Sequence, residues 1–416
     1  MDMNNQFIEA IEANDFAKVV ELYKKGADIN ANNDYALRLA AENGCLKIVQ
    51  FLVDRRANVN AKDGDALSKA AMNGHLEIVK YLVEEGVNIH ANDNDAFDKA
   101  IEEGHLEVIK YMIKKGVDIH ADEDYSLRLA VRFGHLDIVK FFCENGANVY
   151  DNREIALCLA AEYGHLDIVR FLIKNKSVDI HADDDNALCL AAENGHTNVV
   201  KFLLKNGAYD TTDDYYAFRM AVENGHSKIV DLLLEKGVYD DVEASAFLIA
   251  VQRGYFKIVE SLIDYEVDVN AHNEFAIKTA AHHGYANIVE LLIKNGADVH
   301  VDNEAPLKLA TQFGHLEVVK VLHKKGVDIH ADEENTLRVA IRYGHLDIVK
   351  FFIENEKVNI HAKDDIYLRI AANFNHSDIV HYLVSKGADV NVLDIMLRVK
   401  YNLTLAYPPG GHYVKL

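Results

Sequence analysis

The sequence has few of the residues that divide a chain or cross-link it. Proline occurs three times in 416 residues, and no Pro-rich or Ser/Gly-rich linker is present. This favours one continuous array over separate domains joined by linkers. No C-x-x-C pair occurs among the four cysteines, Cys45, Cys143, Cys158 and Cys189, so neither a disulfide framework nor a zinc site is predicted. Unpaired cysteines without an apolar N-terminal leader indicate a reducing compartment, the cytoplasm.

Positive charge is also scarce. Lys and Arg total 44 against 66 Asp and Glu, a formal net charge of −22. Such a surface repels nucleic acid and anionic membranes, and no apolar run approaches the roughly 18 residues of a membrane helix. We therefore expect no nucleic-acid or membrane partner. Hydrophobic residues make up 50% of the chain, enough for the continuous core that stacked repeats build beyond ordinary domain size.

A glycine returns at a nearly fixed interval along the chain. Successive positions lie 29 to 31 residues apart, at Gly44, Gly74, Gly104, Gly134, Gly164, Gly195, Gly225, Gly254, Gly284, Gly314 and Gly344. Asn14 extends the series one step upstream and Asn375 one step downstream. A period of this size indicates a solenoid. We predict one array over residues 1–400, with thirteen helix pairs and a terminal half-unit, followed by a tail at 401–416.

Each repeat reads as two short helices and a connection. In residues 125–146 a first helix carries Leu127 and Ala130, Gly134 breaks the chain, and a more apolar second helix carries Ile138 and Val139. Gly146 stands where a helix C-terminus favours a left-handed residue. The connection then alternates apolar and polar residues. Neither helix is long enough to be stable alone, so stacking must stabilise both.

These units resemble the ankyrin repeat. The motif L-x-x-A-A-x-x-G-H-x-x-I-V-x-x-L appears as Leu188 to Ala192, Gly195-His196, Val199-Val200 and Leu203-Leu204. The family period is about 33 residues, and the deficit lies at the finger between helix pairs. The resemblance implies an all-α ankyrin solenoid with short β-turn fingers. The short-fingered units look like those of the ankyrin families encoded by giant DNA viruses (mimivirus-like). Acidic or Asx residues before the first helices are predicted N-caps: Asp34, Asn94, Asp124, Asp185 and Asp365.

No catalytic or cofactor motif appears in the sequence. Nucleophile elbows, phosphate loops and H-E-x-x-H are absent, so we predict a non-enzymatic protein without cofactor or metal. Most of the 21 histidines recur at the Gly-His turn or the finger. We expect the turn histidines to bond backbone groups of the neighbouring unit. The adjacent pair His282-His283 lacks a third ligand at tetrahedral spacing, which disfavours zinc.

The residue pair before each repeat glycine is the predicted binding position. In ankyrin arrays the end of the first helix and the finger form the concave face, and here the pair varies while its surroundings repeat. Exposed aromatic rings are typical of binding hot spots. The candidates fall in two clusters, Arg132, Phe133 and Tyr163, and Phe313, Arg342, Tyr343 and Phe374. The alternative is that these rings pack on the next helix. We expect a monomer that binds a basic or extended protein, which would be a host factor if the chain is viral.

A second hypothesis makes the array a substrate or decoy for an ankyrin-directed asparaginyl or histidyl hydroxylase. Asn30 and Asn60 have a leucine eight residues before them, which resembles the hydroxylated finger sites of other ankyrin proteins. Residues 207–247 depart from the repeat and contain the 29-residue step. They are interpreted as a hinge, a partner-specific acidic patch, or a degenerate unit.

Overall fold

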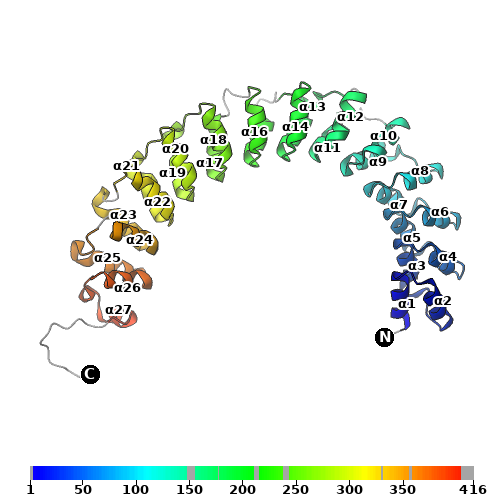
Figure 1. The fold of residues 1–416 in the computed structure, drawn as a ribbon, viewed down its shortest axis with the longest axis horizontal. Coiled ribbons are helices and arrows are strands. Elements are labelled where there is room, and N and C mark those ends of the chain that lie inside the picture. The colour runs from blue at the N-terminus through cyan, green and yellow to red at the C-terminus, as the bar shows by residue number, and fades with distance from the viewer. Residues whose placement is uncertain are drawn as a thin grey trace. The chain divides into compact units, whose positions relative to one another are not determined.

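The computed structural model describes residues 3–147, 155–176, 178–209, 215–237, 243–328, 331–355 and 358–403. These residues contain 27 α-helices and one 3-10 helix and no strand (Figure 1). The all-α prediction is therefore confirmed for the described part of the chain. Two compact units can be distinguished, Met1–Ala217 and Phe218–Leu416, and each is described by itself.

The first unit holds seven helix pairs. Their bounds are α1 Met3–Glu12, α2 Phe16–Lys24, α3 Ala31–Glu42, α4 Leu46–Val53, α5 Ala61–Met72, α6 Leu76–Glu84, α7 Ala91–Glu102, α8 Leu106–Lys114, α9 Ala121–Phe133, α10 Leu136–Glu144, α11 Ile155–Glu162, α12 Leu166–Lys176, α13 Ala182–Glu193 and α14 Thr197–Lys205. The unit boundary falls inside α15, Tyr216–Glu223.

The second unit continues the same alternation. Its helices are α16 Ser227–Leu234, α17 Glu243–Arg253, α18 Phe256–Asp264, α19 Ala271–His283, α20 Ala286–Lys294, α21 Val301–Gln312, α22 Leu316–Lys324, α23 Ala331–Tyr343, α24 Leu346–Asn355, α25 Ala362–Asn373, α26 Ser377–Ser385, η1 Val390–Val392 and α27 Ile395–Lys400.

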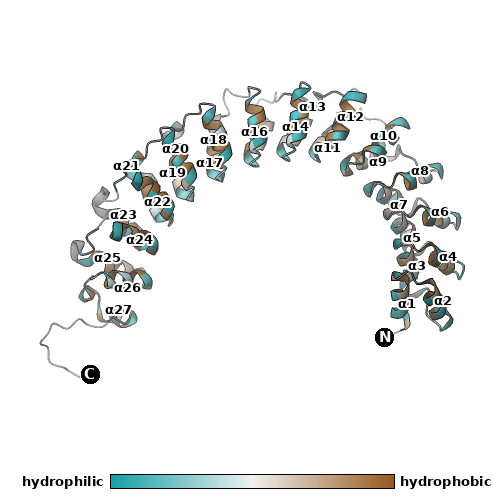
Figure 2. Cartoon of the chain, in the orientation of Figure 1, coloured by the Kyte–Doolittle hydropathy of each residue, from teal (hydrophilic) through white to brown (hydrophobic). Residues whose placement is uncertain are grey.

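The core lies between the two helices of each repeat and between successive repeats. First helices pack on first helices, as α3 on α5 and α5 on α7, and second helices pack on second helices, as α4 on α6. The predicted motif positions are buried: Leu37, Ala40 and Ala41 in α3, and Ile48, Val49 and Leu52 in α4. Figure 2 shows helices with a hydrophobic and a hydrophilic side. Each repeat thus buries its apolar side against its neighbours, as a solenoid requires.

Eight of the turn histidines bond their repeat to the preceding one. His75 Nε2 donates to the carbonyl of Glu42 at 3.0 Å, and His135 Nε2 donates to that of Glu102 at 2.7 Å. The same bond recurs at His105, His165, His196, His315, His345 and His376. The prediction that these histidines bond backbone groups of a neighbouring unit is confirmed. Each bond satisfies a carbonyl at a helix C-terminus, which has no partner within its own helix.

The finger has an unusual backbone just after the alternating connection. Asn32, Asn33 and Asp34 all have left-handed φ angles of 55° to 58°. Asn and Asp occupy this region at lower cost than other side chains with a Cβ. The N-cap prediction is wrong, because all five residues have positive φ. Instead of capping its own helix, the Asp34 carboxylate accepts the Asn58 amide of the next repeat at 3.0 Å.

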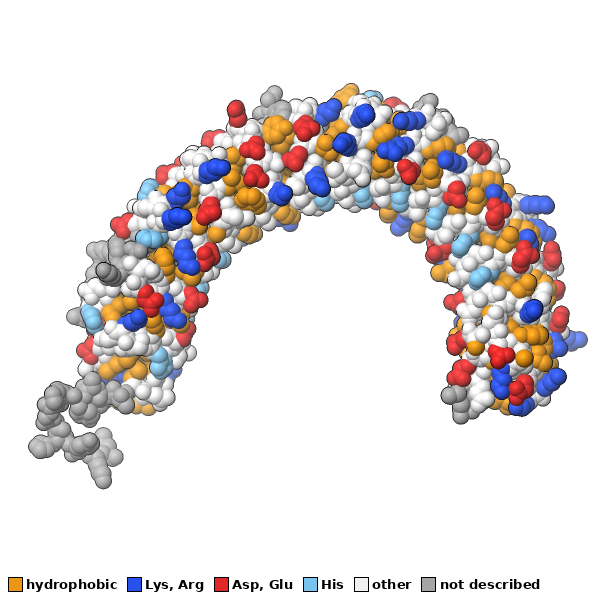
Figure 3. All heavy atoms as spheres, in the orientation of Figure 1, with side chains coloured by type: hydrophobic (Ala, Val, Ile, Leu, Met, Phe, Trp, Pro, Cys, Tyr) orange, Lys and Arg blue, Asp and Glu red, His pale blue; other side chains and the backbone are white. Residues whose placement is uncertain are grey.

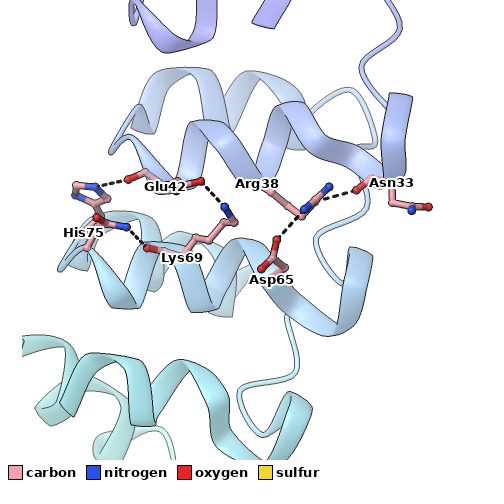
Figure 4. Close-up of polar contacts among 7 residues, drawn as sticks. Asn33, Arg38, Glu42, Asp65, Lys69 and His75 are labelled. Carbon is pink, nitrogen blue, oxygen red and sulfur yellow. Dashed lines mark hydrogen bonds and ion pairs between the residues drawn. The ribbon is translucent and has the colours of Figure 1, made fainter. Parts of the chain in front are cut away.

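Polar side chains also link neighbouring repeats. Arg38 donates through Nε and Nη2 to the carbonyls of Asn33 and Asn32, and through Nη1 to Asp65 Oδ2 at 2.9 Å (Figure 4). Lys69 pairs with Glu42 one repeat upstream. Arg38 therefore holds its own left-handed finger in place and connects it to the next repeat.

The C-terminal half-unit caps the second compact unit. Tyr401, which the sequence assigns to the tail, is buried, and its hydroxyl donates to the Ala372 carbonyl at 3.1 Å. His381 Nε2 donates to the Tyr401 carbonyl, also at 3.1 Å. Residues 404–416, the rest of the predicted tail, lie outside the described residues.

Candidate protein-binding surface

The candidate aromatic side chains all lie at or just beyond the C-terminal ends of first helices. Their exposed fractions are between 37% and 48%, for Phe133, Tyr163, Phe313, Tyr343 and Phe374. Rings in the core of the same array are almost completely buried; Phe352, for example, is 1% exposed. The five rings therefore stand at the surface, each with one part against the protein.

In the second compact unit, three of these rings follow one another in successive repeats. The ring centroid of Phe313 lies 4.2 Å from that of His282, in an edge-to-face arrangement. Gln312 Nε2 donates to the Tyr343 hydroxyl at 3.3 Å. We name Phe313, Tyr343 and Phe374 the aromatic stripe. Each of its rings contacts the residue pair one repeat upstream.

Arg342 joins two rings of the aromatic stripe. Its guanidinium carbon lies 6.0 Å from the Tyr343 ring centroid and 5.2 Å from that of Phe374. A guanidinium in this range is attracted to the ring face. The Arg342 carbonyl also accepts the His376 bond at 2.9 Å. The backbone and the side chain of Arg342 are thus both held in place, which reduces the conformational entropy lost when a partner binds.

The first compact unit repeats this arrangement once. The Arg132 guanidinium carbon lies 5.4 Å from the Tyr163 ring centroid. Tyr163 also stacks against His165, with centroids 6.4 Å apart and ring planes 12° apart. Phe133 is 43% exposed. Arg132, Phe133 and Tyr163 therefore form a smaller surface cluster of the same chemistry.

An acidic hollow, not anticipated from the sequence, lies between the first helices α7 and α9 and their fingers. It has a volume of about 230 Å³, and its lining includes four carboxylates, Asp93, Asp98, Asp118 and Asp122, beside Phe97 and Tyr125. Burial and, to a smaller extent, the charges of Glu102 and Asp95 together raise the pKa of Asp98 to about 6. The sequence does contain a signal. Asp98 occupies the repeat position of Arg38 and Arg128, six residues before the glycine, and it is the only acidic residue at that position.

No grouping typical of a metal site occurs in the described ranges. Nowhere in them do three or more His, Cys, Asp or Glu side chains come together to hold a metal. Burial and the neighbouring His283 and His315 lower the pKa of His282. His283 Nδ1 donates to the Thr279 carbonyl at 3.0 Å. His282 and His283 are thus explained by local contacts. In addition, no described helix combines the length and apolar character needed to cross a bilayer.

The two candidate hydroxylation sites are both exposed but differ in their contacts. Asn60 accepts the Asn88 amide at 3.1 Å and donates through Nδ2 to the Gly86 carbonyl at 3.5 Å. Asn30 donates its backbone amide to Asp28 Oδ1 at 2.9 Å. The Asn60 side chain therefore bridges two repeats. Of the irregular segment 207–247, residues 210–214 and 238–242 lie outside the described residues, so the three interpretations of this segment stay open.

The repeats of this chain match a known protein family. A family model of ankyrin repeats in three copies matches eight overlapping segments, 7–93, 63–123, 97–184, 127–214, 157–246, 218–303, 247–333 and 307–394. No curated protein matches the sequence significantly. Ankyrin repeats generally mediate protein–protein interactions, and proteins built from them are typically non-enzymatic. The helix pairs and the family model agree, and the chain belongs to the ankyrin repeat family.

Proposed function

We propose that this chain is a non-enzymatic scaffold that binds a protein partner through the residues before the repeat glycines, on the concave face of the array. The observation that carries the proposal is the aromatic stripe. Three half-exposed rings occupy equivalent positions of successive repeats, and His282, Gln312 and Arg342 contact them from the preceding repeats. Rigid aromatic side chains and arginine are the residues that most often dominate binding energy.

The charge of the partner follows from the acidic hollow. Four carboxylates line it, so it suits a Lys or Arg side chain of a basic or extended segment. The formal net charge of −22 steers such a partner toward the array by long-range attraction. We further propose that the chain acts as a monomer in the cytoplasm. If it derives from a giant DNA virus, as its short fingers suggest, the partner is a host protein.

Quantitative capture tests the proposal. Wild-type chain and the triple variant Phe313→Ala, Tyr343→Ala, Phe374→Ala would be immobilised, and proteins retained from host cytosol would be compared by mass spectrometry. We expect a partner that is enriched on the wild type and lost from the triple variant. Phe16→Ala is the matched control, because Phe16 is a similarly exposed ring on the second helix α2. Equal capture by all three proteins would contradict the proposal.

A second candidate function is that of a hydroxylase substrate or decoy. The exposed finger residues Asn30 and Asn60 favour it. Because the Asn60 side chain bridges two repeats, we expect Asn30 to be modified first. Intact mass and peptide mapping after co-expression with the asparaginyl hydroxylase would detect one added oxygen atom. An unmodified chain would remove this function without affecting the scaffold proposal.

A further inference from the structure

A second surface of opposite charge lies on the second helices of the first compact unit. Between α12 and α14 there is a hollow of about 410 Å³ whose lining includes Leu166, Arg170, Lys174, Lys201, Phe202 and Lys205. We name it the basic hollow. Four cationic side chains line it and no carboxylate does, although the chain as a whole has a net charge of −22. Figure 3 shows Lys and Arg side chains gathering over α12 and α14.

The excess of positive charge in the basic hollow reflects one departure from the repeat, the loss of an acidic residue from α14. In α6, α8 and α22 a lysine pairs with the glutamate three residues before it, each time at 2.7 Å: Lys80 with Glu77, Lys110 with Glu107, and Lys320 with Glu317. In α14 the position of that glutamate is taken by Asn198. Lys201 therefore has no carboxylate at this spacing. Arg170 retains its counterpart Asp167, at 3.7 Å and with both side chains exposed.

The last turns of α12 and α14 both carry a lysine at the same repeat position, as those of α2, α8, α20 and α22 do. Lys174 and Lys205 occupy the position held by Glu84 in α6 and Glu144 in α10. A cation near a helix C-terminus is favourable for the helix. Both lysines are exposed, so they can meet an anion from solution.

Phe202 forms the apolar part of the basic hollow. The Arg170 guanidinium carbon and Lys174 Nζ reach over it from α12, at 5.6 and 5.7 Å from the ring centroid. Attraction to the ring face holds these cations near one place. Phe202 and Leu166 are both half-buried, which leaves apolar surface for a small side chain. The hollow therefore combines ordered positive charge with an apolar patch.

We propose that the basic hollow binds a short acidic peptide segment of a protein partner, with two or three carboxylates around one apolar side chain. Charge complementarity supports this occupant. A nucleic acid carries one charge per roughly 1.7 Å and would run beyond the hollow onto a chain with 22 excess negative charges. A short peptide stays within a Debye length of the four cations, about 8 Å at physiological salt. This site goes beyond the proposed scaffold function, because it needs neither the aromatic stripe nor the acidic hollow.

Fluorescence anisotropy with the full chain tests the proposal. The probe is a labelled, end-blocked pentapeptide of four glutamates around a central leucine. We expect binding that weakens with salt and falls about tenfold in the double variant Lys201→Glu, Lys205→Glu. The control is Lys110→Glu, Lys114→Glu, which reverses equivalent charges on α8 and should leave binding within about twofold. Circular dichroism melts confirm that both variants fold.

Three outcomes would overturn the proposal. The wild type could fail to bind the probe, or both double variants could lose binding equally, which would indicate unspecific attraction to lysines. A labelled single-stranded oligonucleotide could also bind more tightly than the peptide. A peptide with alanine in place of leucine tests the apolar part, and unchanged affinity would contradict the role of Phe202. The aromatic-stripe variant should bind the probe like the wild type, so this result is independent of the scaffold proposal.

Discussion

Asp98 replaces a residue that elsewhere stabilises the finger. Arg38 and Arg128 donate to carbonyls of their own fingers, whereas Asp98 brings a carboxylate to that position. Burial and the neighbouring acids raise its pKa to about 6 from a reference value of 3.8. The folded chain therefore binds a proton at Asp98 more readily than the unfolded chain. Ionisation of Asp98 above pH 6 opposes folding, and protonation removes this cost.

We predict that Asp98→Asn stabilises the chain at pH 7. A pKa unit corresponds to about 1.4 kcal/mol, and solvent screening of this half-buried group reduces the expected gain to about 1 kcal/mol. The gain over the wild type should shrink as the pH falls through 6 and vanish near 4. Urea unfolding at several pH values measures it. Asp63→Asn, at an exposed finger position, is the control without a gain, and a pH-independent gain for Asp98→Asn would disprove the assignment.

Tyr343 distinguishes the two interpretations of the aromatic positions. Its ring is 47% exposed, so Tyr343→Ala should cost no more than about 1 kcal/mol of stability. A core ring should cost about 3–5 kcal/mol, and Phe352→Ala, a ring that is 1% exposed, provides that reference. Thermal melts compare the two variants. Equal losses would mean that Tyr343 packs inward and would remove it from the binding surface.

At the scale of the element, the turn between the two helices of a repeat depends on glycine for two reasons. Gly104 has φ +81°, and a Cβ there would lie 2.7 Å from the His135 ring of the next repeat. Gly116 has φ +107°, but a Cβ there would meet no atom within 4 Å. The two glycines thus share the backbone requirement and differ in the contact between repeats.

We therefore predict that Gly104→Ala is more destabilising than Gly116→Ala. The left-handed backbone alone costs about 1–2 kcal/mol, which is the loss expected for Gly116→Ala. Displacing His135 also breaks its bond to the Glu102 carbonyl, which adds about 1–3 kcal/mol. Chemical denaturation of both variants measures the difference. Identical losses would show that the histidine contact contributes nothing.

At the scale of the whole molecule, the irregular segment coincides with a boundary. The two compact units meet between Ala217 and Phe218, inside residues 207–247. In a repeat array each repeat is stabilised by its immediate neighbours, so weak repeats open first. A single array over residues 1–400 remains our prediction, and limited proteolysis that releases a stable non-repeat domain would contradict it.

We predict unfolding that is not two-state, with early hydrogen exchange in residues 207–247. The amides of α15 and α16 should exchange faster than those of α7 and α9, because the neighbouring repeats depart from the motif. Hydrogen exchange followed by mass spectrometry gives the comparison. Uniform protection along the chain would eliminate the hinge interpretation and leave the acidic patch or the degenerate unit.

The sequence by itself determined the helix pairs and their buried faces. The i, i+3, i+4 spacing of Ile138, Val139 and Phe142 places them on one side of a helix, and all three are buried. Positive φ at Gly134 and Gly146 likewise follows from local stereochemistry. These features involve residues a few positions apart, so their geometry is fixed by the helix itself. Leu136 and Phe141, two further apolar residues of this helix, are only half-buried.

Only the tertiary structure decided which side chains meet between repeats. Asp34 caps no helix because the Asn58 amide, 24 residues away, is its partner. Tyr343 is 47% exposed, and its hydroxyl accepts a hydrogen bond from Gln312 of the preceding repeat. The acidic and basic hollows arise in the same way, from substitutions on adjacent helices. Such contacts depend on how two repeats stack, and the spacing within one repeat does not contain that information.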